Sequence, residues 1–267
     1  MMAAAGTPDW NPGTYHRFRG LRLRPALDLL RSLPPLPEGG VVDLGCGAGD
    51  AGPALRALGR PLTGVDLSPA MLDKARDSGA YDRVDQADMA SWTPDTPPAL
   101  IFSNAALHWV GDHPALLPRL AATLAPGGTL AVQVPHQNNA PSHRMWLTLA
   151  EEHFPGRVDP DRIPGVLRPA EYHHLLAPLG QLTLWETEYY QELAPQAEGH
   201  PVRRFTEATF ARPVLEPLDP EEQARLIAAY EAVMDSVYPA DAQGRVLFPF
   251  RRMFFTLTLQ DSSANSA

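Results

Sequence analysis

A glycine-rich stretch, VVDLGCGAGDAG at residues 41–52, most strongly limits what this chain folds into. Two β-branched residues and an acid lead into closely spaced glycines. A buried strand that enters such a turn and continues into a helix leaves backbone N–H groups free and lets a ligand approach closely. The stretch therefore predicts a strand–loop–helix unit with a ligand-binding loop.

The same stretch satisfies two loop patterns that point to different ligands. Gly47, Gly49 and Gly52 form G-x-G-x-x-G, a pattern typical of dinucleotide-binding loops. Asp43 and Gly45 extend the run to D-x-G-x-G-x-G. A carboxylate at Asp43 repels a pyrophosphate and attracts a cation that carries sulfonium and ammonium groups. The acid thus favours a cationic cofactor, while the dinucleotide stays an alternative.

Strand and helix patterns alternate through the first half of the chain, which predicts parallel β-α-β units. Apolar runs predict the central strands, as expected for buried strands of a parallel sheet. The predicted strands are 41–45, 61–67, 83–87, 99–107 and 129–135, and the helices are 21–32, 52–59, 68–79 and 113–128. Beyond residue 136 we expect helices at 141–154 and 219–237 and strands at 181–191 and 252–259.

These elements predict an α/β fold with four segments. We expect an N-terminal arm and helix over the cofactor and acceptor site in residues 1–33, and a cofactor-binding core in 34–191. Residues 192–250, polar and helical, are expected to form an insertion that caps the core between the last two strands. The last strand and a disordered tail are expected in 251–267.

Composition narrows the classes of partner. A net charge of −9 disfavours a nucleic-acid partner, because no general basic field exchanges counterions with phosphates. Cys46 is the single cysteine and the histidines show no metal-ligand spacing, so we expect neither a disulfide nor a metal site. No segment has the apolar length of a membrane span, and the start does not read as a secretory signal. We therefore expect a cytoplasmic protein.

Two further acids suit a nucleoside. Asp66 ends the second predicted strand, where an acid hydrogen-bonds a ribose diol. Asp88 follows the third predicted strand in QADMASW and suits an adenine amino group. The ribose contact fits both cofactor alternatives, whereas Asp88 together with Asp43 favours an adenosyl group joined to a cation.

The motifs VVDLGCGAGD, GVDLSPAMLDKA, QADMASW, LIFSNAALHWV and LAPGGTLAVQVP, in this order, resemble those of class I S-adenosylmethionine-dependent methyltransferases. DWNPGTYHRFRGLRLRPALDLL, PSHRMW and YPADAQGRVLFPFRRMFF are similar to segments of trans-aconitate 2-methyltransferases. The resemblance covers nearly the whole chain. It implies a Rossmann-like, seven-stranded, mostly parallel sheet with helices on both faces and an antiparallel last strand.

The resemblance also implies roles for individual residues. It implies that the cofactor is S-adenosylmethionine, which leaves as S-adenosylhomocysteine. The glycines wrap its methionine part, Asp66 takes the ribose hydroxyls, Asp88 and Met89 hold the adenine, and Asn104 lies near the methyl group. The full predicted set is Asp43, Gly45, Gly47, Gly49, Asp66, Leu67, Asp88, Met89 and Asn104.

The acceptor implied by the resemblance is a small polycarboxylate, trans-aconitate, which is converted to a monomethyl ester. A carboxylate is ionised at neutral pH, so transfer needs alignment and anion binding, with no general base. Arginine suits bidentate carboxylate binding. No catalytic residue is assigned; the candidates for positioning the acceptor are Tyr15, Arg22, His108, His143, Arg212 and Arg251.

Two departures from the family pattern lie in segments expected over the acceptor. VRRFTEATFARPVL (202–215) keeps Thr209, Arg212 and Pro213 but lacks two family glycines, and Arg251 replaces a family proline. The alternatives are therefore another small acid or a carrier-bound malonyl group as acceptor. A nicotinamide-dependent dehydrogenase and a cofactor-binding protein without catalysis are further alternatives. The oligomeric state is left open.

Overall fold

The computed structural model describes residues 19–163, 165–207 and 209–260, and for residues 19–22 the backbone alone. The described chain divides into two compact units. The first contains the chain up to Val134, then Leu167–Trp185, and the residues from Met253 onward. The second contains Pro135–Val166 and Glu186–Arg252.

A seven-stranded sheet of order β3-β2-β1-β4-β5-β7-β6 confirms the predicted fold class. β1 pairs in parallel with both β2 and β4. Leu259 N donates to Gly128 O and His136 N donates to Arg251 O, so β7 runs antiparallel to β5. The strands are β1 (Val41–Leu44), β2 (Leu62–Asp66), β3 (Arg83–Gln86), β4 (Leu100–Asn104), β5 (Thr129–Pro135), β6 (Gly180–Leu193) and β7 (Val246–Leu259).

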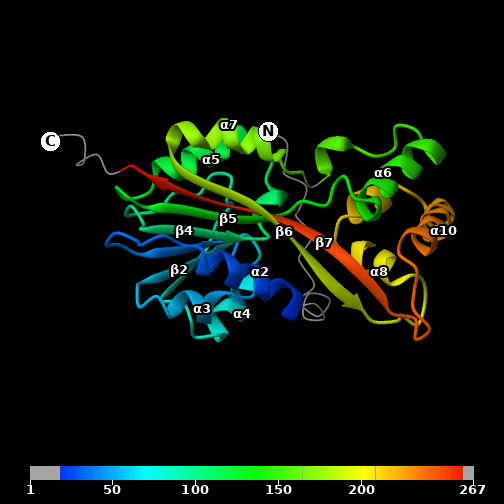
Figure 1. Cartoon of the computed structure of the whole chain (residues 1–267), viewed down its shortest axis with the longest axis horizontal. Helices are drawn as coiled ribbons and strands as arrows, with labels where there is room; N and C mark the ends of the chain where they lie inside the picture. The colour runs from blue at the N-terminus through cyan, green and yellow to red at the C-terminus, as the bar shows by residue number, and fades with distance from the viewer. Residues whose placement is uncertain (1–18, 164, 208, 261–267) are drawn as a thin grey trace. The chain divides into compact units, whose positions relative to one another are not determined.

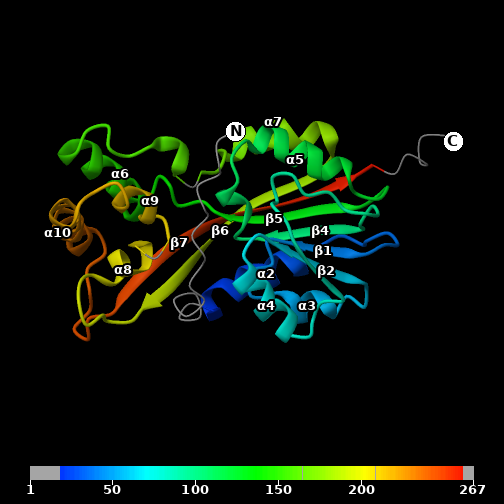
Figure 2. The same cartoon turned by 180° about the vertical axis from the view of Figure 1, so that it is seen from behind.

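Helices cover both faces of the sheet in the first unit, as predicted. Figures 1 and 2 show α5 and α7 on one face and α2, α3 and α4 on the other. Because the strand order reverses between β1 and β4, a crevice opens at the carboxyl ends of these strands. The helices of this unit are α2 (Arg19–Arg31), α3 (Gly52–Arg56), α4 (Pro69–Asp77), η1 (Leu107–Trp109), α5 (His113–Ala122), α7 (Pro169–Leu176) and η3 (Ala177–Leu179).

Local chemistry sets the start of α4 at the predicted position. The Ser68 hydroxyl accepts a hydrogen bond from Met71 N (3.4 Å), and Pro69 occupies the first helical position, where its missing N–H costs nothing. Central strand β1 is buried along its whole length. The chain therefore enters the glycine loop from a rigid, fully packed strand.

The second unit confirms the predicted helical insertion between the last two strands. α8 (Pro201–Glu207), α9 (Arg212–Leu215) and α10 (Pro220–Val237) follow β6, and α6 (Pro141–His153) and η2 (Pro160–Arg162) belong to the same unit. The Trp146 ring on α6 stacks on Tyr230 of α10 at 3.8 Å, and its Nε1 donates to Thr206 Oγ1 (2.9 Å). This buried contact joins α6, α8 and α10.

The last strand begins at Val246, six residues before the predicted start at 252. Val246, Phe248 and Phe250 are buried, and the intervening Leu247 is exposed, which is the period-two pattern of a strand. Pro249 interrupts this pattern in the sequence, because proline lacks the N–H that a ladder uses. Its carbonyl accepts a hydrogen bond from Gln137 Nε2 (2.9 Å).

Candidate active site

The glycine loop follows β1 and folds back against β2. Gly45 N and Cys46 N both donate to Val65 O, at 2.8 and 2.9 Å. Gly45, Gly47 and Gly49 have φ values of 79°, 53° and 83°, in the left-handed region. A Cβ on Gly45 would lie 2.2 Å from the Cβ of Ala106. The loop therefore has a conformation and a close approach that require glycine.

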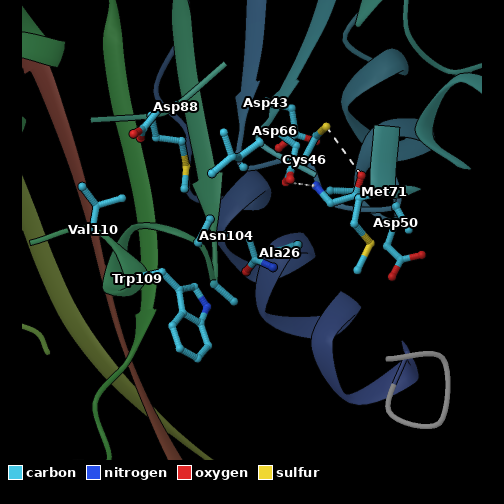
Figure 3. Close-up of a pocket in the computed structure, with 18 of the residues that line it drawn as sticks. Ala26, Asp43, Cys46, Asp50, Asp66, Met71, Asp88, Asn104, Trp109 and Val110 are labelled. Carbon is cyan, nitrogen blue, oxygen red and sulfur yellow. Dashed lines mark hydrogen bonds between the residues drawn. The ribbon is translucent and has the colours of Figure 1, made fainter. Parts of the chain in front are cut away.

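A cavity of about 500 Å³ lies in the first unit, at the carboxyl ends of β1, β2 and β4. Figure 3 shows Asp88, Asn104 and Trp109 around the same cavity as Asp43 and Asp66. Gly49, which was predicted to touch the ligand, does not line the cavity. The structure brings eight of the predicted cofactor residues together there: Asp43, Gly45, Gly47, Asp66, Leu67, Asp88, Met89 and Asn104.

Asp66, at the end of β2, holds the loop and faces the cavity. Its Oδ2 accepts from Gly47 N (2.9 Å; Figure 3) and its Oδ1 accepts from Ser68 N (3.0 Å). An ionised carboxylate has about four acceptor positions, so two stay available for ligand hydroxyls. The same side chain can thus order the loop and bind a diol.

Asp43, in the middle of β1, is 2% exposed. Its Oδ2 accepts a hydrogen bond from the Tyr81 hydroxyl (2.7 Å). Burial raises the pKa of Asp43 to about 7; the Tyr81 hydrogen bond opposes this shift, and the negative charge of Asp66 adds to it. A cation in the cavity would favour the ionised form.

Asn104, the last residue of β4, and Ala105, which follows it, line the cavity. Asn104 Oδ1 is buried and has no hydrogen-bond partner among the described residues. Ala105 has φ 53°, and its N–H donates to Gln133 O (2.9 Å). A non-glycine residue in the left-handed region costs about 1 kcal/mol or more. Asn104 therefore leaves a buried acceptor in the cavity wall that an N–H group of a ligand can use.

Residues that suit an aromatic base line another part of the cavity. Leu67 and Trp109 are 43% and 38% exposed, and Met89 lies with them in the cavity wall. Asp88 Oδ1 accepts from Ala90 N (2.8 Å), which leaves its other oxygen available for an amino group. Apolar side chains beside a carboxylate are the surroundings that an adenine needs.

Arg119, on α5, holds this segment and was not found from the sequence. Its guanidinium donates to Met89 O (3.0 Å), Ala90 O (2.9 Å) and Trp92 O (2.6 Å). Arg119 is the single arginine in the mostly apolar sequence of α5, HPALLPRLAA. This isolated charge is the feature of the sequence that could have indicated its role. One planar donor bound to three carbonyls fixes the loop at residues 89–92, which forms part of the cavity wall.

The charge of the cavity separates the two possible cofactors. Asp43, Asp50, Asp66 and Asp88 line it, and no arginine, lysine or histidine does so among the described residues. A pyrophosphate would meet repulsion from all four carboxylates, whereas a sulfonium and an ammonium would be attracted. The buried acceptor on Asn104 and the glycine loop also fit a compact cationic amino acid joined to a nucleoside.

Two acceptor candidates belong to the N-terminal segment of the sequence, and a third lies in η1, after β4. Tyr15 lies outside the described residues, and Arg22 lies on α2, where the backbone alone is described. His108 lies in η1, half-buried, with its ring 4.8 Å from that of Trp109. His108 does not line the cavity, although its neighbour Trp109 does.

The other three candidates belong to the second unit. His143 is buried beside Phe210, with ring centroids 4.6 Å apart, and burial lowers its pKa to about 3. Arg212 pairs with Glu216 at 2.8 Å on the surface. Arg251 lies 3.8 Å from Glu188 on neighbouring strands. His143 is therefore a neutral imidazole at physiological pH. Arg212 and Arg251 each form an ion pair with a glutamate.

Two wider surveys cover the described residues only. None of their helices is both long enough and apolar enough to cross a membrane. No group of three or more histidine, cysteine, aspartate or glutamate side chains in this part of the chain could hold a metal ion.

Comparison with known proteins agrees with this site. A methyltransferase-domain family matches residues 15–180. The YcgJ protein of Bacillus subtilis has a similar fold, with a TM-score of 0.54 at 16% identity, over 92% of this chain and 100% of that one. The fold, the glycine loop and the family match define the chain as a class I methyltransferase, whose cofactor is S-adenosylmethionine.

Relatives of higher identity narrow the family. A trans-aconitate 2-methyltransferase of Methylobacterium radiotolerans is 40% identical, over 92% of this chain and 96% of its own length. One from Methylobacterium nodulans is 42% identical with the same coverage, and one from Rhizobium meliloti is 38% identical over 94% and 98%. The chain belongs to the trans-aconitate 2-methyltransferase family. This assignment sets aside the dehydrogenase and the non-catalytic binding protein.

Proposed function

We propose that the protein transfers the methyl group of S-adenosylmethionine to a carboxylate of trans-aconitate and forms a monomethyl ester. The observation that carries this proposal is the identity of 38–42% with relatives of that name, spread over nearly the whole chain. The acceptor is a small molecule, and the free, buried Cys46 suits a reducing cytoplasm.

The chemistry asks the protein for alignment. The cofactor supplies a methyl group on a sulfonium, already activated for transfer. A carboxylate acceptor is ionised at neutral pH, so no side chain has to remove a proton. Holding oxygen, methyl and sulfur in line can lower the barrier by about 7–11 kcal/mol. The cofactor side of this alignment rests on Asp66, Asn104 and the glycine loop.

An anionic acceptor needs cationic side chains. Among the described residues that line the cavity there is no arginine, lysine or histidine. Tyr15, Arg22, His108, His143, Arg212 and Arg251 stay the proposed positioning residues. The segment 202–215, which departs from the family pattern, forms α8 and α9, and Arg212 begins the second of these helices. A different acid as acceptor, or a carrier-bound malonyl group, is the alternative that these departures support.

A methyl-transfer screen with isotope-labelled cofactor tests the proposal. The acceptors are trans-aconitate, its cis isomer, saturated tricarboxylates, small dicarboxylates and a malonyl thioester. We expect trans-aconitate to give the highest kcat/KM. Preference for another acid would change the acceptor and keep the reaction, and transfer to none of them by a protein that binds the cofactor would refute carboxylate methylation.

Arg22→Ala tests the acceptor side, with Arg31→Ala as the matched control on the same helix. Arg31 is exposed and pairs with Asp28 at 3.5 Å. We expect Arg22→Ala to raise the KM of the acceptor more than that of the cofactor, because a bidentate cation is lost from the anion. Equal effects on both KM values would remove Arg22 from the acceptor site.

A further inference from the structure

Tyr81 fills a slot formed by three glycines beneath the cofactor loop. It lies between α4 and β3, outside the cavity lining. A Cβ on Gly52 would lie 2.8 Å from Tyr81 Cε2, and Cβ atoms on Gly49 and Gly64 would lie 3.0 Å from ring atoms. The loop, the first residue of α3 and the middle of β2 each leave out a side chain where this ring lies.

This contact explains the last glycine of the G-x-G-x-x-G pattern. Gly52 begins α3 and packs against Tyr81 and Ala80, so its small size serves ring packing. In dinucleotide-binding loops, the third glycine allows the helix to pack closely against the strand. The pattern here therefore positions a tyrosine and does not indicate a pyrophosphate.

The hydroxyl of Tyr81 reaches the buried acid at the cavity floor. It donates to Asp43 Oδ2 at 2.7 Å. Burial and the negative charge of Asp43 raise the pKa of Tyr81, so the phenol stays protonated and acts as a donor. Because the ring packs closely against three glycines, its hydroxyl is held in the direction of Asp43.

The other groups that face this pair do not support a negative charge on Asp43. Asp66 on β2 adds to the repulsion, and Asp50 of the loop acts on Tyr81 with the same sign. Burial, and then the negative charges of Asp43 and Asp66, raise the pKa of the Cys46 thiol, so it stays neutral. Arg76 on α4 acts electrostatically on Cys46. The Tyr81 hydroxyl is the group that lowers the pKa of Asp43.

We propose that Tyr81 is a positioning residue of the cofactor site, which holds the Asp43 side chain as an oriented carboxylate ready for the cationic methyl donor. Without the hydroxyl, the buried acid keeps its proton at neutral pH and offers no charge to a cation. Tyr81 does not line the cavity, and it acts through Asp43 alone.

Tyr81→Phe tests the proposal, because the ring still fills the slot and only the donor is lost. Calorimetry gives the Kd of S-adenosylmethionine for both proteins from about pH 6 to about pH 9. We expect the variant to bind about tenfold more weakly near pH 7, as for a lost hydrogen bond to a charged group. The ratio of the two Kd values should fall toward one at high pH, where Asp43 is ionised in both proteins. Since both proteins meet the same ligand, its own amino titration cancels in the ratio.

Two controls separate this role from structural support. Tyr172→Phe removes another buried hydroxyl of the same unit. This hydroxyl hydrogen-bonds His113 Nδ1 at 2.6 Å, and neither residue lines the cavity. That variant should leave the Kd unchanged at every pH. In an Asp43→Asn background, Tyr81→Phe should cause no further loss, because the charge on which it acts is gone.

Three outcomes would overturn the proposal: no loss of affinity, a loss that is equal at every pH, or a loss that persists undiminished in the Asp43→Asn background. If Tyr81→Phe does not fold, a carbon-13 NMR titration of Asp43 in the wild-type protein decides instead. We expect a midpoint near neutral pH that moves down when the cofactor binds. A midpoint that does not move would equally refute the proposal.

Discussion

Replacing Asp66 by alanine gives the sharpest test of the cofactor site. Asp66 Oδ2 accepts from Gly47 N at 2.9 Å and Oδ1 accepts from Ser68 N at 3.0 Å. The variant loses both bonds and the two acceptor positions that face the cavity. It therefore removes the proposed ribose contact and the hydrogen bond between the loop and β2 at the same time.

The magnitude follows from the bonds that disappear. A hydrogen bond to a charged group contributes about 1.5–3 kcal/mol, and each 1.4 kcal/mol is about tenfold in affinity. Losing one such ribose bond alone therefore weakens S-adenosylmethionine by about tenfold to about a hundredfold. We expect a Kd for Asp66→Ala at least about tenfold above that of the wild type.

Titration calorimetry measures this Kd, and Asp82→Ala provides the matched control. Asp82 Oδ2 accepts from Leu62 N at the other end of β2 (2.8 Å) and pairs with Arg56, but it does not line the cavity. Its loss should leave the cofactor affinity unchanged. An Asp66→Ala protein that binds the cofactor as tightly as the wild type would refute the ribose assignment.

Three further predictions concern buried side chains. The pKa of Asp43 in the folded protein is raised to about 7 from an ordinary 3.8, so its contribution to stability is full below pH 3.8 and is lost as the pH rises through 7. Asp43→Asn should therefore raise the free energy of unfolding at alkaline pH by ~1–3 kcal/mol in urea titrations, and it should weaken cofactor binding. Burial lowers the pKa of His143 to about 3 from 6.5, so the free energy of unfolding should fall as the pH drops from 6.5 toward 3. This fall should be less steep in His143→Gln, and an equal fall in both proteins would contradict the burial of His143 as a neutral ring. Trp146→Ala should cost ~3–5 kcal/mol in thermal unfolding, because its ring stacks on Tyr230 and is fully buried; a cost below about 1 kcal/mol would show that this contact does not hold the helices together.

The central part of the fold was predictable because local and tertiary demands agree there. Ser68 and Pro69 form a helix start that needs no distant contact. The buried run of β1 ends at glycines whose conformations the loop itself demands. Such signals lie within a few residues of one another, so the sequence expresses them directly.

The missed residues depend on contacts between distant segments. Tyr81 reaches Asp43 across 38 positions, and Arg119 reaches Met89 across 30. Nothing next to either residue shows these partners. The early start of β7 was missed for a related reason, since Pro249 breaks the local strand pattern while the alternating burial of its neighbours follows from packing. Residues that line the cavity could thus be predicted one by one, but the contacts that support them could not.

The four aspartates around the cavity have a consequence for the kinetics of a two-substrate enzyme. A polycarboxylate acceptor carries the same sign of charge as this wall, so the cavity, which is the proposed donor site, repels it. High acceptor concentrations should then not displace the donor, and inhibition by excess acceptor that competes with S-adenosylmethionine should be absent. By its charge, the cavity sorts a cationic donor from an anionic acceptor before either reaches its final position.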